Sequence, residues 1–148
     1  MSDLNQQAQQ MEKAIIIAVR AHENQRQRDG TPYILHPLFL MSQMYDHPTR
    51  MAALLHDVVE DTAYTLEQLQ SELDLDDDIT TAIRLLTHEE DVSYEDYLTR
   101  LKPNPIARQV KLADLKHNMD VRRLNIVAPR DQVRLERYRR SWWYLMQP

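Results

Sequence analysis

The sequence predicts an all-α protein, a compact bundle of about eight helices in a single domain spanning residues 1–148. Only one of the 148 residues is glycine, against a usual share of about 7%, and hairpin-turn signals are few. Apolar residues recur at helical spacing along nearly the whole chain. The scarcity of glycine also excludes the dinucleotide-binding fingerprint, the P-loop and the kinase glycine-rich loop, which each need several glycines.

The first helix is predicted over about residues 3–24. Its apolar face consists of Met11, Ala14, Ile15, Ala18 and Val19. The polar segment 25–33 follows and contains the single glycine, Gly30, close to Pro32. These residues predict a loop.

Two prolines predict the starts of the next helices. Pro37 is predicted to take the first position of a helix over residues 38–45, because proline is tolerated where no helical N–H donor is needed. Pro48 opens the following helix, whose apolar positions continue to Val59.

Capping residues predict the middle helices. Thr65 caps a short helix that ends near residue 72, and the acidic residues 76–78 open another. Ser93 and Asp96 resemble a capping box at the start of a helix that reaches Leu101.

The C-terminal part predicts two further helices. One covers about residues 106–124, and Pro129 opens the last. This helix ends in aromatic residues, and its tryptophans Trp142 and Trp143 either pack inside the bundle or contribute to a homodimer contact.

Composition and charge narrow the function classes. The net charge is −5, with 13 acidic residues against one basic residue in segment 60–96 and seven arginines against two acidic residues in segment 122–140. This overall acidity argues against a nucleic-acid partner. No apolar run is long enough for a membrane span, and the first ten residues do not resemble a signal peptide, so we expect a cytoplasmic protein. Because there is no cysteine, a bound metal would need histidine and carboxylate ligands.

The segment ALLHDVVEDT, residues 53–62, carries the strongest chemical signal. Four ionisable residues, His56, Asp57, Glu60 and Asp61, interrupt an apolar helix. Offsets of three and four residues place them on nearly the same face, one turn apart. Since charged groups are seldom buried without a partner or a metal, the segment predicts a metal site with acid–base groups beside it.

Three residues elsewhere could complete such a site. His36 precedes a helix among apolar residues, and the alternative is a structural histidine. Asp114 lies inside an apolar helical stretch, and the alternative is a buried ion pair with Lys111 or Lys116. Asn118 follows Asp114 by one turn and could orient a water or hold a phosphate, the alternative being a solvent-facing amide. The other histidines are predicted to be structural or solvated: His22, His47, His88 and His117.

Three segments of the chain carry the motifs of a known family. In order, they read AHENQ followed by GTPYILHP, then ALLHDVVEDT, then VKLADLKHNM. From about residue 12 to residue 124, their order and spacing resemble the hydrolase domain of RelA/SpoT-type alarmone enzymes, within the HD phosphohydrolase superfamily. The match is especially to the stand-alone small alarmone hydrolases. The resemblance implies an all-α HD bundle without the synthetase domain of the long family members.

The resemblance also implies a ligand set and a reaction. His36, His56, Asp57 and Asp114 match the positions that bind one divalent metal, usually manganese. Ligation by nitrogen and oxygen suits manganese and leaves iron, zinc and cobalt open. The family removes the 3′-pyrophosphate of guanosine tetraphosphate or pentaphosphate, (p)ppGpp, and leaves GDP or GTP.

Other matched positions would act on water and substrate. Glu60 and Asp61 match the acidic pair that positions and activates the attacking water, and Asn118 matches a residue that contacts the nucleotide. A metal lowers the pKa of a bound water, and a carboxylate one turn away can accept its proton.

The chain departs from the family pattern at substrate-contacting positions. Gln27 stands where the family has an arginine against the guanine base, and Arg26 and Arg28 flank it. Either arginine could replace the missing contact or bind phosphate. In the third motif Val121 replaces a threonine whose hydroxyl would contact the nucleotide. Arg122, one turn beyond Asn118, is a further candidate for a phosphate contact, as is its neighbour Arg123.

The sequence therefore predicts a metal-dependent hydrolase of a small nucleotide, with (p)ppGpp as the first candidate. The first alternative is an HD phosphohydrolase of another phosphorylated nucleotide, such as NADPH or another 3′-substituted nucleotide. The second alternative is a sensor that binds a nucleotide without turnover, against which the intact Glu60–Asp61 pair argues.

Overall fold

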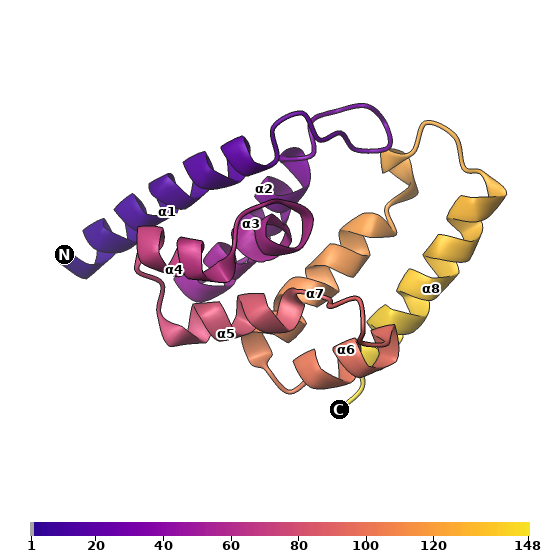
Figure 1. Cartoon of the computed structure of the whole chain (residues 1–148). Coiled ribbons are helices and arrows are strands. Elements are labelled where there is room, and N and C mark those ends of the chain that lie inside the picture. Colours follow the sequence, from indigo (N-terminus) through magenta and orange to yellow (C-terminus); the bar gives the residue numbers. More distant parts are fainter. Residues whose placement is uncertain (1) are drawn as a thin grey trace.

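The computed structural model describes residues 2–148, and its regular elements are helices. Figure 1 shows their arrangement. The elements in chain order are α1 (Ser2–Ala21), α2 (Leu35–Ser42), α3 (His47–Asp61), α4 (Leu66–Leu73), α5 (Asp77–Leu86), α6 (Tyr94–Leu101), α7 (Pro105–Asn118), the 3₁₀ turn η1 (Val121–Arg123) and α8 (Pro129–Met146). The predicted all-α bundle of about eight helices is confirmed.

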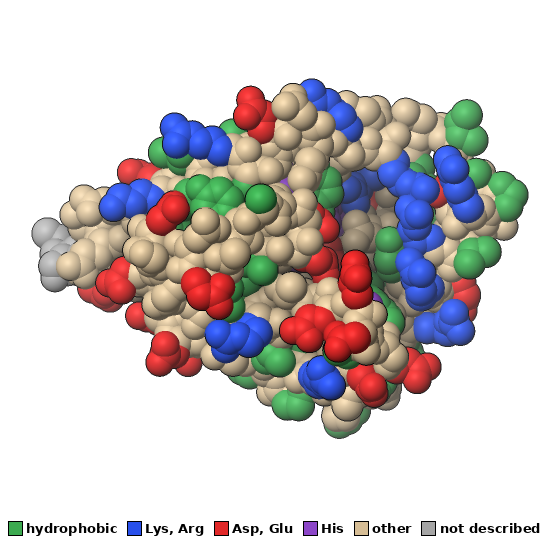
Figure 2. All heavy atoms as spheres, in the orientation of Figure 1, with side chains coloured by type: hydrophobic (Ala, Val, Ile, Leu, Met, Phe, Trp, Pro, Cys, Tyr) green, Lys and Arg blue, Asp and Glu red, His purple; other side chains and the backbone are tan. Residues whose placement is uncertain are grey.

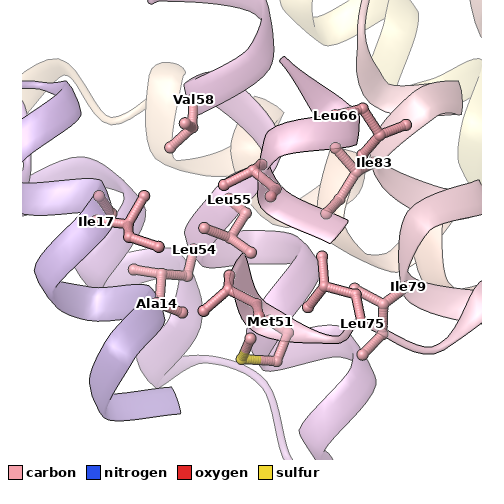
Figure 3. Close-up of a cluster of buried hydrophobic side chains, with 13 residues drawn as sticks. Ala14, Ile17, Met51, Leu54, Leu55, Val58, Leu66, Leu75, Ile79 and Ile83 are labelled. Carbon is pink, nitrogen blue, oxygen red and sulfur yellow. The ribbon is translucent and has the colours of Figure 1, made fainter. Parts of the chain in front are cut away.

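Helix α3 is the centre of the bundle. It packs against α1, α2, α5 and α7, and its residues from Met51 to Leu55 are all buried. Figure 3 shows the apolar cluster in which Met51, Leu54 and Leu55 of α3 meet Ala14 of α1 and Ile79 of α5. A second cluster joins α3 to α6, α7 and the end of α8. Because α3 is fixed on several sides, its polar end has a defined position.

Side-chain caps start α3, α4, α6 and α7, whereas Asp76, in the predicted acidic start of α5, makes no such hydrogen bond. Asp46 accepts from the Thr49 N–H before Pro48 of α3, and Thr65 and Gln68 form a complete capping box for α4. Ser93 accepts from the Asp96 N–H, which starts α6. The predicted starts of these helices agree with the structure to within one or two residues.

The predicted bounds of three helices are wrong. Helix α1 ends at Ala21, not near residue 24, because the chain turns and Asn24 takes a left-handed conformation with φ of 68°. Helix α2 begins at Leu35 and ends at Ser42, so Pro37 is its third residue. Helix α7 ends at Asn118, and the Asp120 side chain then accepts from the Arg122 N–H to start η1.

Two apolar residues of α1 differ from the predicted pattern. Val19 is 46% exposed, whereas Ile17, outside the predicted face, is buried. At the other end of the chain, Trp142 packs against the second apolar cluster and Trp143 is 59% exposed. The homodimer contact stays a prediction. None of the helices within residues 2–148 has the length and apolar character that a membrane crossing requires.

Candidate metal site and nucleotide pocket

Three helices bring the four predicted metal ligands together. His36 lies on α2, His56 and Asp57 lie on α3, and Asp114 lies on α7. All four side chains are buried. His36 Nε2 is 2.8 Å from Asp114 Oδ1, and His56 Nε2 is 3.0 Å from Asp57 Oδ2 and 3.8 Å from Asp114 Oδ1. Such a convergence of nitrogen and oxygen donors from separate helices is what a divalent ion requires.

The two ring nitrogens of His56 are arranged as in a metal-binding histidine. Its Nδ1 lies 2.7 Å from the Ala53 carbonyl oxygen, so Nδ1 carries the proton and donates it to that oxygen. In a neutral ring this tautomer leaves the lone pair of Nε2 for a metal. Nε2 is buried and has no hydrogen-bond partner among the described residues. Burial alone would lower the pKa of His56, but the neighbouring Asp57 and Asp114 raise it well above its usual value. A buried ring nitrogen at which two carboxylates favour positive charge is the observation that favours a cation at this point. His36, His56 and Asp57 each offer a ligand atom within 4.8 Å of the others.

His36 is oriented by a histidine whose role the sequence did not reveal. Its Nδ1 lies 2.7 Å from His117 Nδ1, and the His117 ring stacks on Phe39 at 4.2 Å between ring centroids. Burial and nearby Arg123 lower the pKa of His117 to about 4, so this ring is neutral and can accept the proton of His36 Nδ1. His36 Nε2 lies 2.8 Å from Asp114 Oδ1, and a metal ligated by both atoms would take the place of this hydrogen bond. The prediction that His117 is structural agrees with this supporting contact.

Tyr33 is a second supporting residue that sequence reasoning missed. Its hydroxyl donates to Asp57 Oδ2. Burial and the Asp57 charge raise the pKa of Tyr33, so the hydroxyl keeps the proton it donates. The only signal was its position three residues before His36, within the loop that precedes α2.

Asp114 forms the predicted buried ion pair, and its carboxylate also lies beside the other predicted ligands. Its Oδ1 faces His36 and also accepts from Asn118 Nδ2 at 3.2 Å, while its Oδ2 accepts from Lys111 Nζ at 3.0 Å. Lys116, the other predicted ion-pair partner, is exposed. Burial alone would raise the pKa of the Asp114 carboxyl, but the Lys111 charge holds it well below its usual range. Asp114 therefore remains an anion that can bind a cation.

Lys111 gives a stability prediction with a control on the same helix. We expect Lys111→Met to lower the free energy of unfolding by about 3 kcal/mol, because it leaves the buried Asp114 carboxylate without its cation. Lys116→Met removes an exposed charge and should change this energy by less than about 0.5 kcal/mol. Urea unfolding of both metal-free variants measures the difference, and equal stabilities would contradict the assigned ion pair.

The acidic pair lies one turn beyond the ligands of α3. Asp57, Glu60 and Asp61 offer oxygens within 4.8 Å of one another. Glu60 Oε1 accepts from the His88 N–H at 2.8 Å, which ties the carboxylate to the segment after α5. Glu60 and Asp61 are exposed, but partial desolvation beside the ligand cluster raises the pKa of both, and the Asp57 charge raises the two pKa values further. Carboxylates with raised pKa values beside a cluster of metal ligands are suited to accept a proton.

The loop after α1 holds the end of α3 in place. Gln25 Nε2 donates to the Asp61 carbonyl oxygen at 3.2 Å, and Gln25 Oε1 lies 2.8 Å from His22 Nδ1. His22 is buried and its ring lies beside Tyr33. The prediction of a structural role for His22 agrees with this arrangement.

A cavity of about 190 Å³ adjoins the ligand cluster. Among the predicted substrate contacts, it is lined by Arg26, Gln27, Arg28 and Asn118. Tyr33 also lines it, so the cavity shares walls with the ligand cluster. Figure 2 shows a hollow on this face of the molecule, with acidic side chains on one rim and a row of basic side chains on the other.

The structure does not bring Arg122 into this cavity. Its side chain is 87% exposed and forms an ion pair with Asp120 at 2.7 Å. Its neighbour Arg123 lines the cavity instead, and its Nη2 donates to Gln27 Oε1. Arg28 pairs with buried Asp131 at the start of α8, which joins the loop 25–33 to that helix.

Comparison with known proteins now identifies the family. The family model described as HD domain matches residues 14–126. The chain belongs to the HD domain family. This match confirms the resemblance seen in the motifs, and it accords with the His–Asp cluster as a site for a divalent metal.

Curated relatives match this chain over a small part of their own length. A probable GTP pyrophosphokinase of Mycobacterium leprae is 35% identical over 138 residues, which cover 86% of this chain and 17% of that protein. A guanosine-3′,5′-bis(diphosphate) 3′-pyrophosphohydrolase of Haemophilus influenzae is 54% identical over 61 residues, which cover 38% of this chain and 9% of that protein. The chain thus spans less than a fifth of the length of these relatives.

A solved structure shares the HD domain fold. It is described as a metazoan ortholog of SpoT that hydrolyses ppGpp, and it superposes with a TM-score of 0.73. The alignment covers 93% of this chain and 85% of the other, at 23% sequence identity. The likeness confirms the helical bundle.

Proposed function

We propose that this HD domain is a metal-dependent hydrolase that removes the 3′-pyrophosphate of (p)ppGpp. The observation that carries the proposal is the buried Nε2 atom of His56, which lies among two carboxylates and a second histidine. The acidic pair and the arginine-lined cavity lie directly beside it. The names of the bacterial relatives and of the metazoan neighbour support this substrate.

In this proposal His36, His56, Asp57 and Asp114 hold one divalent metal, most simply Mn²⁺. When bound, the metal supplies a Lewis acid for a phosphate oxygen and lowers the pKa of the attacking water. Glu60 and Asp61 orient that water and take its proton as its oxygen adds to the phosphorus beside the 3′ oxygen. The P–O3′ bond breaks, and the 3′ oxygen leaves as a hydroxyl once protonated. Asn118, anchored on Asp114, faces the nucleotide.

The charge of the cavity lining favours a single nucleotide as the ligand over a long nucleic acid. Four arginines line it, Arg26, Arg28, Arg123 and Arg134, against two acidic residues, Asp120 and Asp131. This local excess of positive charge suits a compact anion, although the whole chain carries a net charge of −5. The arginines Arg26 and Arg28 are proposed to contact the phosphates.

Release of pyrophosphate from ppGpp tests the function directly. With added Mn²⁺ we expect GDP and pyrophosphate as products, and we expect no release after treatment with a chelator. NADPH and other 3′-substituted nucleotides form the comparison panel. Cleavage of one of these without cleavage of ppGpp would instead favour the alternative substrate. Tight binding of ppGpp by the metal-loaded protein, with no product, would favour a sensor.

A further inference from the structure

Arg123 is held inside the cavity by acceptors from two separate segments. Its Nη2 donates to Gln27 Oε1 in the loop before α2. Its Nη1 donates to the His117 carbonyl oxygen at 2.9 Å and to Asn118 Oδ1 at 3.2 Å, both at the end of α7. A guanidinium fixed by three hydrogen bonds has a set position and little rotamer freedom left to lose when a ligand binds.

The fixed guanidinium still has donors to offer. Arginine carries five N–H donors, and the three hydrogen bonds leave the Nε–H and one Nη2 hydrogen without a partner among the described residues. These donors belong to a side chain that is only half-buried and that lines the cavity. They are therefore available to a ligand with two neighbouring acceptor atoms.

The walls around Arg123 suit a flat ring. Leu124, Leu135 and Tyr138 line the same cavity and present apolar and aromatic surface. Tyr33 and Asn118 line it on the side of the ligand cluster, where they contact Asp57 and Asp114. A nucleotide with its base against the apolar walls would direct its ribose and phosphates toward the ligand cluster.

We propose that Arg123 selects the nucleobase by donating to the O6 and N7 acceptors of a guanine. This inference rests on the proposed function, because it assumes that a purine nucleotide occupies the cavity. Adenine presents an amino donor in place of O6, so the same guanidinium would lose one hydrogen bond and face a donor. Gln27 acts as a positioning residue, because its Oε1 holds Arg123 in place.

Neighbouring arginines provide the comparison. Arg122 precedes Arg123 in the same 3₁₀ turn but is exposed and bound to Asp120. Arg139 lies on α8, where it is exposed and pairs with Glu136 at 2.8 Å. Loss of positive charge at any of the three positions would weaken both nucleotides by the same factor, whereas loss of a contact with the base would change the ratio of the two affinities, and only at Arg123.

The test measures binding of ppGpp and of its adenosine counterpart ppApp by calorimetry with Mn²⁺. The Glu60→Gln protein is the background, because its slower turnover limits cleavage of either nucleotide during the measurement. We expect it to bind ppGpp about 10- to 100-fold more tightly than ppApp. Adding Arg123→Met should remove most of this preference by weakening ppGpp alone. Arg123→Lys should not restore the preference, because lysine lacks the planar pair of donors. Arg139→Met should leave the preference unchanged.

Several outcomes would overturn the proposal. These are equal affinities in the background protein, an equal loss for both nucleotides in Arg123→Met, no binding of either nucleotide, or loss of the preference in Arg122→Met. Melting temperatures of the variants separate a structural role of Arg123 from recognition, since a cap on α7 would affect stability but not the ratio of the two affinities. A wild-type protein that prefers ppGpp but releases no pyrophosphate would contradict only the proposed hydrolysis.

Discussion

Replacing Asp57 by asparagine should remove the metal and the hydrolytic activity together. The amide would keep the shape of the side chain and an oxygen that can accept from the Tyr33 hydroxyl. It would remove the negative charge that lies 3.0 Å from His56 Nε2. Because a carboxylate binds a divalent ion far better than an amide oxygen does, we expect at least about a 100-fold loss of metal affinity. Pyrophosphate release should fall by at least the same factor at limiting Mn²⁺.

Metal content and activity should be measured on the same preparation. Elemental analysis after dialysis gives the stoichiometry, and circular dichroism shows whether the helices are retained. Excess Mn²⁺ is expected to restore part of the activity if Asp57 acts as a ligand. Normal metal content in an inactive Asp57→Asn protein would contradict the ligand assignment and would place Asp57 in the chemistry alone.

Replacing Glu60 by glutamine should have the opposite pattern, with the metal retained and turnover lost. The substituted side chain can still accept from the His88 N–H through its amide oxygen, so the end of α3 should stay in place. The amide cannot take a proton from water. Removal of a general base costs about 10²- to 10⁴-fold in rate, and we expect kcat to fall in that range with little change in KM. Wild-type turnover in this variant would exclude Glu60 from the chemistry.

The Glu60 carboxylate also determines the direction in which kcat should change with pH. Partial desolvation raises the pKa of Glu60, and the charges of Asp57 and Asp61 add to this effect. A base works only when it is deprotonated, so kcat should rise with pH through the raised pKa and should fall as pH drops below it. This acid limb should lie at a higher pH than an unperturbed glutamate would give. In Glu60→Gln the residual rate should no longer show the fall at low pH that protonation of Glu60 causes.

Much of the site could be predicted from the chain alone. The helical periodicity and the capping residues Thr65 and Ser93 predict local structure, and local hydrogen bonds decide it. The neighbours His56 and Asp57 form one ligand group because a single helix carries both. His36 and Asp114 were predicted from their apolar surroundings and their motifs. An ionisable residue inside an apolar segment predicts a site because a buried charge needs a partner or a metal.

Other features depended on contacts between distant segments. The spacing predicts that His117 is structural or solvated, and only the packing of α2 against α7 places its ring on His36. The choice between Lys111 and Lys116 as the partner of Asp114 depended on which face of α7 is buried. Which arginine lines the cavity depended on the early end of α7. The turn that starts at Asp120 leaves Arg122 in solvent and places Arg123 against Gln27.

The sequence by itself therefore determined the helical class, the family motifs and the residue types that can hold a metal. The helical class depends on interactions within about one or two helical turns, which neighbouring residues encode, and the motifs depend on the identity and order of residues along the chain. The tertiary structure decided which side chains of α2, α3 and α7 converge and which arginine lines the cavity. These contacts join residues up to 96 positions apart, as Gln27 and Arg123 are, and the packing of whole helices sets their geometry.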